Sequence, residues 1–143
     1  MTLSHILIPT DFSDSSRLAV EYALALREKF SAEITLLHVV EPYFGYGIEI
    51  IPSLDVEACR ERAAEQRLQE LAAGSAAGIP VKTRHLTGKP WHVICKWAAE
   101  NRVDLIVMPT HGHAGLQHLW AGSVAERVVQ KAPCPVLVVR EKP

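Results

Sequence analysis

Short apolar runs alternate with segments of helical periodicity along the whole chain, and this alternation predicts an α/β fold. Five apolar runs separated by four helices favour an open, parallel, five-stranded sheet with helices on both faces. The 143 residues, 48% of them apolar and 22% charged, are enough to build one domain with its own core. Because no internal repeat or linker interrupts the pattern, residues 1–143 are expected to form a single domain.

Each of the five apolar runs has the composition of a strand. They comprise residues 6–9, 34–40, 81–86, 105–108 and 135–139. The third run alternates apolar and polar residues, which favours an edge position. The last run, Pro135–Val139, is almost wholly apolar, and we expect it to lie at the other edge.

Four helices are predicted between these strands. Ser13 is placed to cap the first helix, and Asp14 lies in its first turn. The second helix is expected over residues 54–73, followed by Gly74 and Gly78. The third begins near Pro90, and the fourth covers residues 124–131. The buried face of the first helix is predicted to comprise Ala19, Tyr22, Ala23, Leu26 and Phe30, and residues 42–53 are expected to form a loop.

Composition restricts the class of protein. The formal net charge of −1 argues against a strongly basic nucleic-acid surface. No apolar run approaches the ~20 residues that span a bilayer, and the N-terminus lacks a basic segment typical of a signal peptide. Cys59, Cys95 and Cys134 form no CxxC pair, so we expect buried thiols in a reducing compartment. These observations predict a cytoplasmic protein without nucleic-acid or membrane partners.

The stretch from the fourth strand to the fourth helix carries the strongest functional signal. Residues 105–108 lead into a glycine-containing loop, and a helix starts near Val124. This arrangement presents backbone N–H groups and a positive helix end to an anion, most often a phosphate. Ser123 with Glu126 also forms a capping box, which is compatible with phosphate binding. The loop carries Thr110, Gly112, Gly115, Gly122 and Ser123.

Asp11 directly follows the first strand. Its carboxylate could accept hydrogen bonds from a ribose hydroxyl or a base amine, or Asp11 and Ser13 could simply cap the first helix. If the first and fourth strands are central neighbours, Asp11 and its sequence neighbours would face residues 108–112 across the crevice where strand order reverses.

Other chemistries lack a matching motif. His111, His113 and His118 do not have a standard zinc spacing, so no metal site is predicted. Gly88-Lys89 fails the phosphate-loop spacing, and neither GxGxxG nor a nucleophile elbow occurs. Because the sequence shows no clear general base, the chain is not expected to be an enzyme, and weak ATP hydrolysis is a third, unsupported alternative.

Together the motifs resemble the universal stress protein family over essentially the whole chain. They are Ile8-Pro9-Thr10-Asp11-Phe12-Ser13, Leu37-His38-Val39, Val103-Asp104-Leu105-Ile106-Val107-Met108, Gly122-Ser123-Val124-Ala125-Glu126-Arg127 and Ala132-Pro133-Cys134-Pro135-Val136-Leu137-Val138-Val139. The resemblance implies the strand order 3-2-1-4-5. The nucleotide-binding branch of the family has the signature G-x2-G-x9-G-[S/T], which Gly112 and Gly122-Ser123 match.

The resemblance also implies a set of nucleotide-binding residues. Pro9, Thr10 and Asp11 would lie against the nucleoside, and the Val39 backbone would meet the adenine edge. The ribose and phosphates would be bound by Met108, Pro109, Thr110, His111, Gly112, Gly122, Ser123, Val124 and Ala125. Pro109 stands where the signature has its first glycine. It would impair binding if the loop needs a positive φ there, and would be tolerated in an extended exit from the strand.

Two functions follow from the resemblance. The first is a stress-response or signalling module that binds ATP, ADP or AMP, with or without magnesium, and changes its partner contacts with the ligand. The alternative is a dimeric interaction protein of the same fold that binds no nucleotide. Either would form a homodimer through the strand Pro135–Val139, because an exposed apolar edge strand needs a cover.

Overall fold

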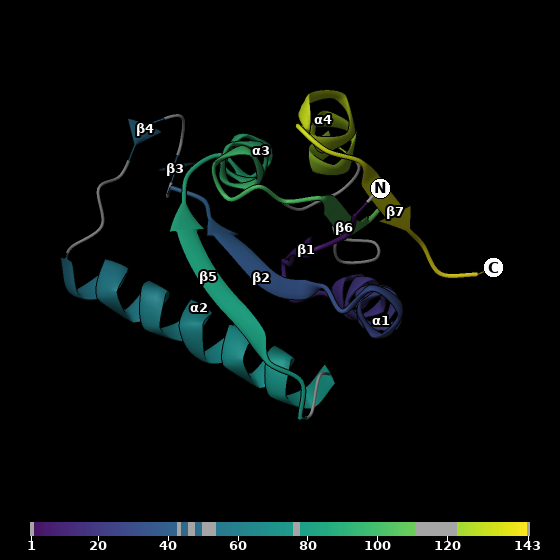
Figure 1. The fold of residues 1–143 in the computed structure, drawn as a ribbon. Coiled ribbons are helices and arrows are strands. Elements are labelled where there is room, and N and C mark those ends of the chain that lie inside the picture. The colour runs from purple at the N-terminus through teal and green to yellow at the C-terminus, as the bar shows by residue number, and fades with distance from the viewer. Residues whose placement is uncertain are drawn as a thin grey trace.

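A five-stranded parallel sheet forms the centre of the protein (Figure 1). The computed structural model describes residues 2–42, 44–45, 48–49, 54–75, 78–110 and 123–142. The strand order is β5-β2-β1-β6-β7, which is the predicted order 3-2-1-4-5. β5 and β7 are the edge strands, as predicted. The sheet comprises β1 (His5–Pro9), β2 (Glu33–Val40), β5 (Val81–Thr87), β6 (Leu105–Pro109) and β7 (Val136–Val139).

Two helices cover each face of the sheet (Figure 1). α1 (Asp14–Phe30) and α2 (Leu54–Ser75) lie on one face, and α3 (Pro90–Glu100) and α4 (Ser123–Lys131) lie on the other. Alternating strand residues supply the two cores, because successive side chains of a strand point to opposite faces. Leu7 and Leu37 pack with α3 and α4, whereas Ile6 and Ile8 pack with α1 and α2.

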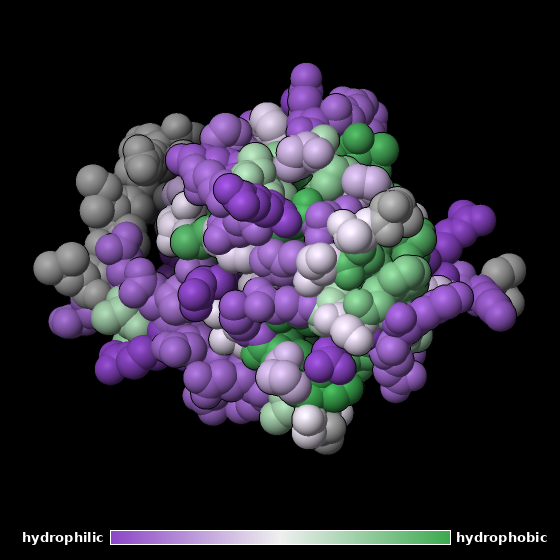
Figure 2. Space-filling view, viewed as in Figure 1, coloured by the Kyte–Doolittle hydropathy of each residue, from purple (hydrophilic) through white to green (hydrophobic). Residues whose placement is uncertain are grey.

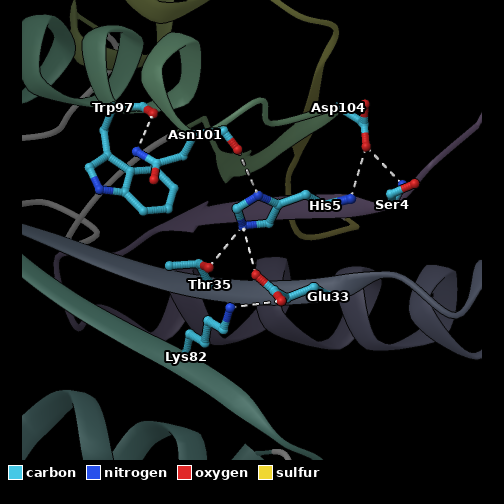
Figure 3. Close-up of polar contacts among 8 residues, drawn as sticks. All are labelled: Ser4, His5, Glu33, Thr35, Lys82, Trp97, Asn101 and Asp104. Carbon is cyan, nitrogen blue, oxygen red and sulfur yellow. Dashed lines mark hydrogen bonds and ion pairs between the residues drawn. The ribbon is translucent and has the colours of Figure 1, made fainter.

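A polar cluster connects four strands at the amino-terminal edge of the sheet (Figure 3). The Asp104 carboxylate accepts hydrogen bonds from the backbone N–H groups of Ser4 and His5, at 2.8 and 2.9 Å. Nε2 of the His5 ring lies 2.9 Å from the hydroxyl of Thr35, a buried residue. Glu33 and Lys82 form an ion pair at 2.8 Å. These contacts join the starts of β1, β2, β5 and β6, at the opposite edge from the predicted site.

Some local expectations were wrong. Gly74 lies within α2, which continues to Ser75, because a glycine near a helix end costs little there. The predicted loop contains a two-residue antiparallel pair, β3 (Phe44–Gly45) with β4 (Ile48–Glu49). Tyr22 and Phe30 are exposed, since the buried face of α1 is turned toward Ser16, Ala19, Val20 and Ala23.

The cysteine prediction was also wrong in part. Cys59 is exposed on α2, whereas Cys95 and Cys134 are half-buried against the core beneath α3 and α4. Burial raises the pKa of both the Cys95 and the Cys134 thiols. All three are free thiols.

Apolar residues are unevenly distributed over the visible surface. Figure 2 shows them gathered on the side of the molecule where α1, α4 and β7 lie, while the α2 side is mostly hydrophilic. Val129 on α4 and Tyr22 on α1 are exposed apolar side chains. None of the described helices is long and apolar enough to cross a membrane.

Gly88 is expected to be essential for the turn from β5 into α3. Its φ is +149°, and a Cβ atom there would lie 2.8 Å from Cγ2 of Val93. Gly88→Ala should therefore lower the free energy of unfolding by about 1–3 kcal/mol. Gly74→Ala is the matched control, because a Cβ there meets nothing within 4 Å. It should leave stability unchanged or raise it by up to ~1 kcal/mol. Urea unfolding of the two variants checks the contrast, and equal stabilities would contradict it.

Candidate functional site

Hydrogen-bonded pairing between β1 and β6 ends before their carboxyl ends, and two prolines explain why. The pairing ends at Leu7↔Ile106, although each strand continues to a proline. Thr10 N donates to Leu37 O and Thr110 N donates to Val139 O, so these N–H groups point away from the β1–β6 boundary. Backbone groups alternate sides along a strand. The missing N–H groups of Pro9 and Pro109 would therefore have faced that boundary. The ladder cannot continue without these donors.

The β1–β6 boundary is also where the strand order reverses, which confirms the neighbours on which the predicted crevice depends. The chain leaves β1 through Thr10, Asp11 and Phe12, and leaves β6 through Thr110. In open α/β sheets this edge is where ligands bind. The topology therefore brings the Asp11 turn and the exit of β6 to the same edge of the sheet.

β2 extends beyond the end of β1, so its last residues have no paired strand on that side. β1 ends opposite Leu37, whereas β2 continues to Val40. Leu37 accepts a bond from the β1 side and Val40 accepts one from Gly88 on the β5 side. By alternation, the N–H and C=O groups of Val39 face the β1 side, where β1 has already ended. Val39 thus has the backbone orientation that recognition of an adenine edge would need.

Asp11 supplies the carboxylate of the site. Its Oδ1 atom accepts hydrogen bonds from the Ser13 N–H at 3.0 Å and from the Ser16 hydroxyl at 2.7 Å. Its Oδ2 atom is buried and has no hydrogen-bond partner among the residues that the structure describes. A buried carboxylate oxygen without a donor is costly, because its lost hydration is not replaced. Oδ2 thus lacks the donor that a buried acceptor needs.

The Asp11 turn also contains the N-cap of α1. Ser13 is the N-cap of α1, and its side chain accepts a hydrogen bond from Ser16 N, as predicted. Helix capping and ligand binding by Asp11 are compatible, because Oδ1 stabilises the turn and Oδ2 does not take part in it. Capping alone leaves Oδ2 unexplained.

Thr10 shapes the loop from a fully buried position. Its hydroxyl accepts a hydrogen bond from Phe12 N at 3.0 Å, and its carbonyl accepts one from Nδ1 of His38 at 2.8 Å. Phe12 has a φ of +66°, in the left-handed region that costs a bulky residue ~1–2 kcal/mol. These bonds hold the backbone on both sides of Asp11.

Sequence reasoning missed an aromatic and cationic stack behind this turn. The Phe12 ring lies 4.5 Å from the His38 ring, and Cζ of Arg67 lies 4.2 Å from the Phe12 centroid. His38 stands in a recognised motif, but only the pairing of β2 with β1 places it beneath Thr10. Arg67 lies 55 residues after Phe12 in the chain, and no sequence pattern connects the two.

The His38 ring is held in its neutral form. Burial lowers the pKa of His38, and the nearby charges of Arg67 and His85 lower it further. The hydrogen bond to the Thr10 carbonyl and the Asp11 charge oppose this shift. Because Nδ1 lies against a carbonyl oxygen, it carries the proton of the neutral ring.

The other predicted residues are placed as follows. Met108 and Pro109 are buried in β6, and Pro109 lies in the extended strand opposite Val139. This is the extended exit that tolerates proline, with no positive φ at that position. Val124 and Ala125 are buried in the first turn of α4, which begins at Ser123. The first N–H groups of a helix lack intrahelical acceptors and suit an anion.

Part of the predicted site lies outside the described residues. This applies to His111, Gly112, Gly122, His113, His118 and the side chain of Ser123. Within the described ranges, no group of three or more His, Cys, Asp or Glu side chains could hold a metal ion.

Comparison with known proteins identifies the class. The universal stress protein family matches residues 2–140, and the chain belongs to this family. It is 38% identical to the universal stress protein MJ0531 of Methanocaldococcus jannaschii over 138 residues, covering 95% of this chain and 81% of that protein.

Solved structures have the same fold. The universal stress protein UspA of Lactobacillus plantarum is 30% identical, with a TM-score of 0.73 and coverage of 98% and 99% of the two chains. A family protein of Arabidopsis thaliana with AMP bound is 22% identical, with a TM-score of 0.69 and coverage of 97% and 92%. At that identity the second likeness shows the fold alone.

We expect stability to fall below about pH 6.5 because of His38. Its pKa is lowered from the usual 6.5 on folding, so the unfolded chain binds more protons as the pH falls through this value. The free energy of unfolding then decreases until the folded-state pKa is reached. His38→Asn retains a donor toward Thr10 but does not titrate, and should show a shallower pH dependence. Urea unfolding at about pH 7.5 and about pH 5.5 measures how the free energy of unfolding depends on pH.

The matched control for this measurement is His92→Asn, because His92 is exposed on α3. It should keep the pH dependence of the wild type. An unchanged dependence in His38→Asn would contradict the assignment.

Proposed function

We propose that this chain is an adenine-nucleotide-binding universal stress protein, a cytoplasmic stress-response or signalling module of one domain over residues 1–143. The observation that carries the proposal is the buried Oδ2 atom of Asp11, which has no hydrogen-bond partner. A ribose hydroxyl would supply the missing donor. Ligand-dependent changes at this edge of the sheet would then alter contacts with protein partners.

The surrounding groups support a complete nucleotide. The Val39 backbone faces the crevice where β1 has ended, and offers both a donor and an acceptor to an adenine edge. The N–H groups at the start of α4 would bind phosphates, which favour the positive end of a helix. The proposed ligands are ATP, ADP or AMP, with magnesium as a companion of the triphosphate.

Binding rather than catalysis is the proposed activity. The only carboxylate of the Asp11 turn already accepts two hydrogen bonds through Oδ1, and it is placed to bind rather than to activate water. The competing function is a dimeric interaction protein that binds no nucleotide. Pro109 favours this alternative because it removes one backbone donor from the crevice.

Asp11→Asn should weaken adenine-nucleotide binding by about 10- to 100-fold, the usual range for a hydrogen bond with a charged group. Asparagine can still accept the bonds from Ser13 and Ser16 through its amide oxygen, so the turn should remain folded. Titration calorimetry with ATP, ADP and AMP, with and without magnesium, measures the effect. Asp14→Asn is the matched control, because Asp14 is exposed in the first turn of α1.

The two competing functions give different outcomes. Nucleotide binding that survives in Asp14→Asn and is lost in Asp11→Asn supports the proposal. Absence of measurable heat and of a thermal shift with wild-type protein at millimolar nucleotide would establish the alternative, a module without nucleotide.

We further propose that two copies pair through β7. The C=O groups of Pro135 and Val139 accept bonds from β6, so by alternation the backbone groups of Val136 and Val138 face outward. Antiparallel pairing across a two-fold axis would satisfy both outward rows. The apolar side of the molecule seen around β7 in Figure 2 would be covered by the same contact.

Val138→Lys should shift the protein toward monomer, because it places a charge on the proposed contact. Val138→Thr is the control, since threonine keeps the β-branched shape and strand preference. Analytical ultracentrifugation at micromolar concentration compares both variants with the wild type. A monomeric wild type would refute this interface.

A further inference from the structure

A cavity lies between α1 and α2, on the face of the sheet that these helices cover (Figure 1). Its volume is about 250 Å³. The lining residues are Phe12, Arg17, Arg67, Glu70, Leu71 and Gly74. Phe12 belongs to the turn described above, but the other five lie on the two helices. The cavity is therefore separate from the groups proposed to bind nucleotide.

The two arginines of this cavity lack an anionic partner. Neither Arg17 nor Arg67 forms an ion pair within the described part of the chain. Cζ of Arg67 instead lies 4.2 Å from the centroid of the Phe12 ring, in a cation–π contact. The N–H groups of a guanidinium in such a contact can still donate to an oxyanion. The two helices thus place two cations around one space.

The other side chains restrict the kind of ligand. Glu70 is tied on α2 by a 3.0 Å hydrogen bond from Gln66, and its single negative charge leaves the lining with a net charge of +1. Phe12 and Leu71 add apolar wall next to the cations. Guanidinium groups bind carboxylate and phosphate oxygens in a bidentate geometry. A short carbon skeleton with an oxyanion group suits both parts of the lining.

We propose that the cavity between α1 and α2 binds a small organic anion through a carboxylate or phosphate group held by Arg17 and Arg67. Phe12 and Leu71 contact its carbon skeleton. Glu70 disfavours ligands of high negative charge.

Occupancy of this cavity bears on the Asp11 turn. Phe12 follows Asp11 directly, and its ring is packed between Arg67 and His38. An anion that repositions Arg67 would change the packing that holds Phe12 in its left-handed conformation. Only this regulatory consequence rests on the proposed nucleotide function. Binding of the anion itself does not.

The test is a titration of the full-length protein, without nucleotide, using succinate and inorganic phosphate as separate probes. Binding is followed by backbone amide NMR shifts. Arg17→Gln and Arg67→Gln should each weaken binding by about tenfold or more, the usual effect of removing a charge-assisted hydrogen bond. Arg62→Gln is the matched control, because Arg62 is exposed on α2 and does not line the cavity. Glu70→Gln should tighten binding by about two- to fivefold, as expected for removing one exposed like charge.

A second readout follows the His38 ring. Arg67 contributes to the lowered pKa of His38, after burial, so an anion that neutralises Arg67 should raise the pKa of His38 in the wild type. The same anion should leave the His38 pKa unchanged in Arg67→Gln. This readout reports occupancy of the cavity without reference to any activity.

The outcomes separate this inference from the proposed function. Saturable succinate binding alone identifies a carboxylate site, and saturable phosphate binding alone identifies a phosphate site. Either result requires sensitivity to Arg17→Gln and Arg67→Gln. Equal weakening by Arg62→Gln would reduce the effect to general charge attraction and overturn the inference. Shifts confined to the start of α4 would also overturn it, while supporting the nucleotide site. Absence of binding by both probes would overturn it and leave the nucleotide proposal untouched.

Discussion

The pair of prolines at the ends of β1 and β6 is the constraint on which the candidate site depends. A parallel ladder between these strands would need backbone donors at Pro9 and Pro109, and neither residue has one. The two strands therefore stop pairing after Leu7 and Ile106, although both remain parts of the same sheet. The end of pairing at the switch point is a consequence of two missing N–H groups. The same early end of β1 leaves the Val39 backbone without a neighbouring strand.

The turn after Pro9 is stable because nearly all its polar groups are bound internally. Thr10 uses its N–H, its carbonyl and its hydroxyl, and Asp11 uses one carboxylate oxygen. The left-handed conformation of Phe12 is maintained by a backbone bond on one side and by ring packing on both faces. Strain of this kind persists only where the surroundings determine it, and it is concentrated at functional sites. Against this background, Oδ2 of Asp11 is the side-chain oxygen of the turn without a hydrogen-bond partner among the described residues.

The sequence predicted the architecture well, because strands and helices leave periodic signals. Strand order needed more than periodicity, and came from the family resemblance. Ser13 was found as a cap from local chemistry alone, since a capping bond joins residues three apart. By contrast, Tyr22 and Phe30 satisfied the helical spacing but are exposed. Periodicity fixes which residues share a face of α1, whereas packing against β1 and β6 decides how that face is turned.

The missed parts of the site depend on long-range contacts. The His38 ring reaches the Thr10 carbonyl because β2 pairs with β1. Arg67 reaches the Phe12 ring because α2 packs on the same face of the sheet. Neither contact has a sequence spacing from which it could be read. The Asp11 carboxylate was found, but its division into one bound and one available oxygen could not be. That division depends on the Ser16 hydroxyl, which reaches Asp11 from the first turn of α1.

Pro109 shows how a departure from a family signature can be assessed from geometry. In its position the missing N–H would have faced the crevice rather than β7, because Thr110 N donates to Val139. The substitution therefore leaves β6–β7 pairing intact and removes a donor only from the side of the proposed ligand. A glycine there would present that donor to a nucleotide, or to the Pro9 carbonyl across the boundary when the site is empty. Proline excludes this hydrogen bond between β6 and β1, in agreement with the end of their pairing after Leu7 and Ile106. The residue that would remove one contact to the proposed ligand thus also ends the pairing of the two strands at this edge.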